Sequence, residues 1–153
     1  MCDYSLMMIP NRLASEGDQL IAHRFNSGTT GLVSLLDFSK WQTDRPVRFW
    51  QRLRDCFVLP TEPSPVVCIP PGARLRIRDI PGDLRKRFGL NACEDAAFTQ
   101  KSAETWQHRD ILLFGNGSEV LLQLLEEGQR VSILSVSSEE SVAPAPAEPA
   151  HAV

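Results

Sequence analysis

The stretch RDILLFGNGSEVLLQLLEEGQRVSILSV, residues 109–136, decides the predicted fold. Its Asn116-Gly117 pair lies between two apolar runs, and this dipeptide accepts the two positive φ angles of a type I′ hairpin turn. A hairpin with these two residues as its loop pairs Leu113 with Val120 and continues that pairing along both runs. The sequence therefore predicts two antiparallel strands joined by a tight turn.

The second half of the stretch predicts a third strand that folds back on the second. Turn residues at 126–129 precede another apolar run, which would place Val131 opposite Leu124 and Ile133 opposite Leu122. Both pairings put branched side chains on the face that the hairpin already makes apolar. The face expected in the core carries Ile111, Leu113, Val120, Leu122, Leu124, Val131 and Ile133. We therefore expect a three-stranded meander that forms one wall of the core.

Length and composition limit the chain to one domain. With 153 residues and 42% hydrophobic content, it can bury one core. We expect a single β-rich domain over residues 1–136, in which residues 30–65 are an inserted excursion, and a disordered Ala/Pro/Glu-rich tail at 137–153. The predicted fold class is mainly β: a small antiparallel domain, barrel-like or sandwich-like, with two short α-helices.

Shorter patterns predict the remaining elements. One helix begins at the cap Asp44-Arg45-Pro46 and runs to Phe57, and a second, DLRKRFGL, is closed by Gly89. Alternating or continuous apolar runs predict further strands at residues 19–25, 66–69, 73–80 and 96–100.

The cytoplasm is the compartment that the sequence predicts. The residues after Met1 lack the cationic start of a signal peptide, and no stretch approaches the roughly 20 apolar residues of a membrane span. In that reducing compartment we expect the cysteines to be thiols or metal ligands rather than disulfides. There are four, without a C-x-x-C pair: Cys2, Cys56, Cys68 and Cys93.

Four blocks of the sequence resemble a group of short bacterial proteins that begin MCDYSL. The blocks are MCDYSL, PNRLASEGDQL, VVCIPPGARLRIRDIP and VLLQLLEEGQRV, and they cover most of the chain outside residues 30–65 and the tail. The group has no established function. The resemblance implies kinship and a bacterial source, and it transfers no catalytic or binding residues.

The leading functional hypothesis is a transition-metal site or a reactive thiol at Cys2, Cys68 and His108. Thiolate and imidazole suit zinc, iron or copper. His23 and Asp110 are further candidate ligands, and Asp110 would share a strand face with His108 because the two lie two residues apart. The alternative is that Cys68 packs in the core and His108 ends a strand.

The second hypothesis is a non-enzymatic adaptor, or a peripheral membrane or protein-interaction module, that uses the helix Arg45–Phe57. The alternative for this helix is that it covers its own core, and the alternative for the arginine ladder at 74–78 is a solvated edge strand. The net charge of −3 and the lack of a recognition motif argue against nucleic acid as a partner. The candidate interaction residues are Arg45, Arg48, Trp50, Arg52, Arg74, Arg76 and Arg78.

The third hypothesis is an N-terminal cysteine hydrolase. Removal of Met1 would leave Cys2 with a free amine beside its thiol, and that amine can act as the base. Such enzymes need a large four-layer domain, which the predicted elements do not supply. The sequence therefore favours a non-enzymatic protein over this hydrolase, and no motif identifies a small-molecule substrate.

Overall fold

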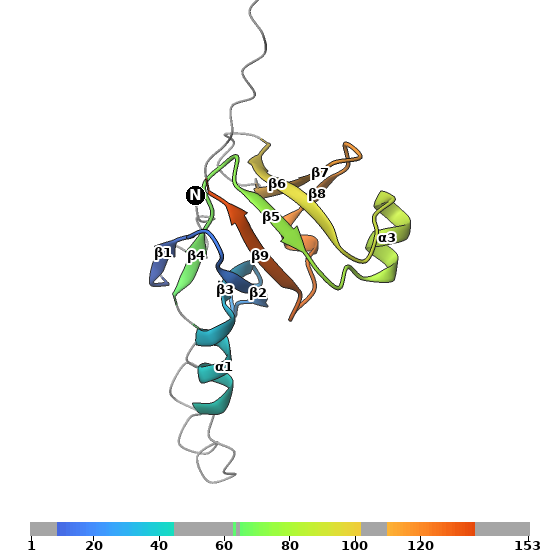
Figure 1. Cartoon of the computed structure of the whole chain (residues 1–153). Coiled ribbons are helices and arrows are strands. Elements are labelled where there is room, and N and C mark those ends of the chain that lie inside the picture. The colour runs from blue at the N-terminus through green and yellow to red at the C-terminus, as the bar shows by residue number, and fades with distance from the viewer. Residues whose placement is uncertain (1–8, 45–62, 64, 102–109, 137–153) are drawn as a thin grey trace, which may run out of the picture.

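The computed structural model describes residues 9–44, 63, 65–101 and 110–136, and these residues build one mixed β-sheet (Figure 1). The predicted mainly-β class is confirmed. The strands are β1 (Asn11–Leu13), β2 (Gln19–Arg24), β3 (Thr30–Ser34), β4 (Val66–Cys68), β5 (Arg74–Ile77), β6 (Glu94–Gln100), β7 (Asp110–Phe114), β8 (Glu119–Leu121) and β9 (Arg130–Ser135). The helices are α1 (Leu35–Asp44), α3 (Gly82–Phe88) and the 3-10 helix η3 (Leu122–Leu124). None of the described helices is long and apolar enough to cross a membrane.

Strand β9, the last strand among the described residues, lies in the middle of the sheet. The spatial order is β1-β4-β3-β2-β9-β5-β6-β7-β8, and all neighbours are antiparallel except β1 and β4. After β8 the chain passes through η3 and a turn, so that β9 pairs with β2 and β5. The predicted meander is therefore wrong at its third strand, because β8 and β9 do not pair within the described residues.

The β7–β8 hairpin forms as predicted, but with a different turn. The backbone N–H of Gly117 donates to the carbonyl of Phe114, and the N–H of Phe114 donates to the carbonyl of Ser118. Gly117 has a φ of 82°, whereas Asn116 is not among the residues with positive φ. This is a three-residue loop, a type I turn followed by a glycine bulge, and not the predicted type I′ turn.

The longer loop shifts the hairpin register by one residue. Leu112 pairs with Val120, and Leu113 pairs with Glu119. Because side chains alternate between the two faces of a strand, this shift moves Leu112 into the core and turns Leu113 outward. Leu112 is 0% exposed and Leu113 40% exposed. The predicted core face is thus wrong for Leu113 and Leu124, which are both exposed. Ile111 is buried as predicted, but alternation along β7 places it on the face opposite Leu112, outside the cluster to which Leu112 belongs.

The sheet curls around one hydrophobic core, which we call the inner core. The inner core takes buried side chains from η3 and from every strand except β1. Although η3 follows β8 at one edge of the sheet, it reaches β3 near the other edge: the side chain of Gln123 accepts a hydrogen bond from the backbone N–H of Thr30 and donates one to its carbonyl. The edge strands β1 and β8 are not neighbours in the sheet order, so the curled sheet stays open.

A second cluster, which we call the α1 cluster, lies on the opposite face of β2, β3 and β4. It contains Ile21, Phe25, Val33, Phe38 and Val66, with Ile9, Leu35 and Trp41 packed against it. Leu35, Phe38 and Trp41 recur every third residue, which places them along one side of α1. The prediction that an excursion begins at residue 30 is therefore wrong, because Thr30–Ser34 is the strand β3 and pairs with β2 over five residues.

Helix α3 forms and ends where the sequence predicts. Leu84 and Phe88 pack against the inner core from one side of the helix. Gly89 follows the last turn with a φ of 65°, and the N–H of Leu90 donates to the carbonyl of Arg85. A left-handed glycine with this hydrogen bond is a common helix stop, since glycine has no Cβ to oppose a positive φ.

Candidate functional site

Cys68, one of the predicted site residues, is not a free thiol in the structure. It is disulfide-bonded, and its partner lies outside the described residues. The expectation that the cysteines are thiols or ligands is therefore wrong for Cys68 and holds for Cys93, a free and exposed thiol. The expectation failed because compartment rules say nothing of which cysteines the fold brings together.

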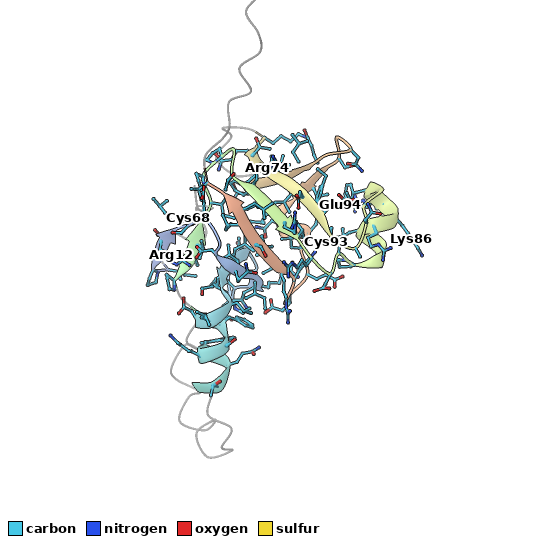
Figure 2. The ribbon with its side chains drawn as sticks, in the orientation of Figure 1. Arg12, Cys68, Arg74, Lys86, Cys93 and Glu94 are labelled. Atoms are coloured by element: carbon cyan, nitrogen blue, oxygen red, sulfur yellow. The ribbon has the colours of Figure 1, made fainter. Side chains whose placement is uncertain are left out.

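Cys68 lies at the outer corner of the sheet, on β4 (Figure 2). It is half-buried, and since Val66 belongs to the α1 cluster, alternation places Cys68 on the same face of the sheet. Strand β4 is short and meets β3 at a single pair, Val33 with Val66. Its other neighbour is β1, which is equally short. Few backbone hydrogen bonds therefore hold the strand that carries this sulfur.

An ion pair secures the β1 side of this corner. Nη1 of Arg12 lies 2.7 Å from Oδ2 of Asp18 and also donates to the carbonyl of Leu13. Burial raises the pKa of Asp18, but the hydrogen bonds from Arg12 and from the backbone of Ser15 outweigh it, and the pKa is lowered. The charged pair thus links β1 to the start of β2 next to the Cys68 corner.

His23, a further candidate ligand, lies on the same face as Cys68 and is buried in the α1 cluster. Its Nδ1 lies 2.7 Å from Oε1 of Glu127, while the backbone N–H of Arg24 donates to Oε2 of the same carboxylate at 2.5 Å. The ring is 4.9 Å from that of Phe25 and 5.2 Å from that of Trp41, both edge-on. A carboxylate at Nδ1 fixes the ring orientation and favours the tautomer with its proton on Nδ1.

Glu127 is the partner that sequence reasoning missed. In the sequence it reads as a turn residue, 104 positions after His23. The contact arises because the turn before β9 continues the β2 ladder: the N–H of Gly128 donates to the carbonyl of Ala22, and Ala22 donates to the carbonyl of Gln129. The carboxylate of Glu127 takes the next position in that ladder. No local pattern signals such a long-range contact.

Asp110 does not join His23. Asp110 is the first residue of β7, and its Oδ1 accepts a hydrogen bond from the side chain of Gln100 at the end of β6. Asp110 alternates with Leu112 of the inner core, whereas His23 lies on the α1 side, and three strands separate β7 from β2. Among the described residues, no group of three or more His, Cys, Asp or Glu side chains is placed to hold a metal ion.

The arginine ladder lies on a central strand, so its interpretation as a solvated edge is wrong. Strand β5 sits between β9 and β6. Arg76 forms a two-pronged contact with Asp95 of β6, with Nε to Oδ1 at 2.7 Å and Nη2 to Oδ2 at 3.0 Å. The hydrogen bond from Arg76 is the main reason that the pKa of Asp95 is lowered. Arg74 and Arg78 are exposed.

Several candidates lie outside the described residues. These are Cys2, Cys56, His108 and the helix predicted at Arg45–Phe57 with Arg48, Trp50 and Arg52, together with the tail at 137–153. Their assigned roles stay predictions. Comparisons with family models, curated proteins and solved structures found no match to this chain.

Proposed function

We propose that the protein works through a thiol–disulfide couple at Cys68, and that it does so in the cytoplasm as a redox-responsive protein rather than as an enzyme. The disulfide at Cys68 is the observation that carries this proposal. Disulfides in a reducing compartment are usually transient, either catalytic or redox-sensing, because thiol buffers reduce the others. A cytoplasmic disulfide is therefore better explained by reversible chemistry than by structural crosslinking.

The surroundings of Cys68 support reversible exchange. Cys68 is half-buried, so an attacking thiolate can approach it without global unfolding. Strand β4, which carries Cys68, and its neighbour β1 each have three residues, and β4 meets β3 at one pair. Short, sparsely paired edge elements open at low free-energy cost. Local opening would expose the sulfur further.

Metal binding by the reduced couple is the second candidate function. Two cysteines that can form a disulfide are also close enough to share one zinc, iron or copper ion once they are thiolates. His108 would supply an imidazole, and His23 shares the face of Cys68 with its ring oriented by Glu127. Carboxylate-oriented imidazoles are common at metal centres. The two functions differ in whether the reduced protein binds a metal ion.

A redox titration tests the first proposal. Untagged protein is equilibrated in thiol buffers between about −220 and −320 mV, the range of cytosolic poise, then alkylated and weighed intact. We expect a midpoint inside this range that the Cys68→Ser variant abolishes and the matched control Cys93→Ser retains. Cys2→Ser and Cys56→Ser identify the bonded partner. A couple that stays fully oxidised or fully reduced across the range would refute the proposal.

Metal analysis of the reduced protein separates the two candidates. After anaerobic reduction and loading with zinc, the metal function predicts stoichiometric zinc that is lost in Cys68→Ser and kept in Cys93→Ser. It also predicts that bound zinc raises the melting temperature, because a ligand that binds the folded state stabilises it. Zinc content at background in the reduced wild type eliminates the metal function and leaves the redox proposal standing on its own titration.

A further inference from the structure

The side chain of Asn116 in the β7–β8 turn is held by the end of helix α3. Its Nδ2 donates to the carbonyl of Phe88 at 3.0 Å and to that of Gly89 at 3.1 Å. Its Oδ1 accepts from the backbone N–H of Ser118 at 2.9 Å. The hydroxyl of Ser118 donates to the carbonyl of Phe88 as well. The turn thus caps the carbonyl groups that α3 leaves without helical partners.

The same dipeptide has an intrinsic covalent reaction. In Asn-Gly the backbone nitrogen of the glycine can attack the Cγ of the asparagine, because glycine has no side chain to block the approach. This reaction of the asparagine side chain makes asparagine a thermolabile residue. In the folded protein both reacting groups are engaged: the N–H of Gly117 donates to the carbonyl of Phe114, and the amide of Asn116 is held at both of its polar atoms.

We propose that Asn116 is a deamidation site and that α3 controls access to it. When the last turn of α3 opens, the Asn116 side chain loses its carbonyl partners and can rotate toward the nitrogen of Gly117. The Gly117 nitrogen gives up its proton and bonds to Cγ, the bond between Cγ and Nδ2 breaks, and the side-chain nitrogen takes up one proton and leaves as ammonia. One water molecule opens the resulting succinimide to aspartate or isoaspartate, so the reaction needs no oxidant and no other reactant.

The product cannot restore the contact. A carboxylate at position 116 has no N–H to donate and would face the carbonyl oxygens of Phe88 and Gly89. It would also place a negative charge at the C-terminus of a helix, where the helix dipole disfavours anions. Leu84 and Phe88 pack α3 on the inner core, so weaker docking of α3 would uncover apolar surface there. Deamidation would act as a one-way change that loosens α3, independently of the chemistry at Cys68.

Two glycine-to-alanine variants at opposite ends of α3 test the proposal. Gly89 has a φ of 65°, so Gly89→Ala strains the helix stop, while an added Cβ would meet Asn116 Nδ2 only at an ordinary 3.6 Å. Gly82 has open space around it, and alanine there favours the helix. Where opening is fast relative to the reaction, the reaction rate follows the open population. We expect Gly89→Ala to deamidate about tenfold faster than wild type, and Gly82→Ala no faster.

The assay is peptide mapping by mass spectrometry, with isoaspartate detection, after incubation of the folded protein at mildly alkaline pH. Wild type unfolded in urea gives the unprotected rate, which we expect to exceed the folded rate by at least about tenfold. Asn116→Asp should mimic the product and increase hydrogen exchange in α3 relative to wild type. Equal rates in the folded and unfolded protein, or equal rates in the two glycine variants, would overturn the proposal.

Discussion

Leu112 and Leu113 on β7 provide a direct test of the hairpin register. The two residues are adjacent, identical and in the same strand, so alanine changes strand propensity equally at both. Leu112 pairs with Phe98 and Val120, which also belong to the inner core, whereas Leu113 pairs with Ala97 and is 40% exposed. Removing a fully buried leucine side chain costs about 2–5 kcal/mol, because transfer free energy is lost and a cavity remains.

We therefore expect Leu112→Ala to lower the free energy of unfolding by about 2–5 kcal/mol and Leu113→Ala to lower it by no more than about 1 kcal/mol. In equilibrium urea unfolding, with a slope of about 2 kcal/mol/M, the first variant should move the midpoint down by about 1–2.5 M. The second should barely move it. If Leu113→Ala is the more damaging change, the two-residue type I′ loop is correct and the observed bulged turn is not.

Three further predictions concern polar contacts. Gln123→Glu should lower the free energy of unfolding by about 1–3 kcal/mol in urea unfolding, because an oxygen that repels the Thr30 carbonyl replaces the donor. Gln123→Ala should cost less, because it removes the donor without adding that repulsion, and an equal or larger cost would contradict this reasoning. The pKa of Asp95 is lowered in the folded protein, so its pairing with Arg76 contributes its full stability above the ordinary pKa of 3.8 and loses that contribution as the pH falls from there through the lowered pKa. The stability difference between wild type and Asp95→Asn should therefore vanish in acid. His23→Phe should melt closer to wild type than His23→Ala, because a ring is retained among the aromatic contacts; equal melting temperatures would contradict this.

Local signals in the sequence predicted most of the elements. Alternation of arginine with Leu75 and Ile77 is sufficient to identify β5, because a strand with one face in the core needs apolar residues at every second position. Gly89 marked the end of α3, because a helix stop needs a left-handed residue. Both signals depend on conformations that a few neighbouring residues determine.

Predictions that needed distant contacts were less successful. The choice between a type I′ turn and a bulged type I turn depends on small backbone preferences, and here Asn116 is engaged by α3, which the hairpin sequence does not reveal. The α1 residues Leu35, Phe38 and Trp41 have the spacing of a helix face, but that spacing becomes informative only once the α1 cluster is known. The contact between His23 and Glu127 depends on strand order, which a single sequence does not fix.

The central position of β9 explains why the meander was a plausible but wrong expectation. A strand that follows β8 closely in sequence usually pairs with it, since loop closure over a short segment costs little entropy. Here β9 instead fills the gap between β2 and β5, each of which would otherwise present an open edge in the middle of the sheet. Val131 pairs with Leu20 of β2 and with Ile77 of β5, and both Val131 and Ile133 are buried in the inner core. The free energy that β9 gains by pairing with two strands and burying its apolar side chains outweighs the entropy cost of closing a longer loop than a β8–β9 hairpin would need. The order of the sheet is therefore decided by β9.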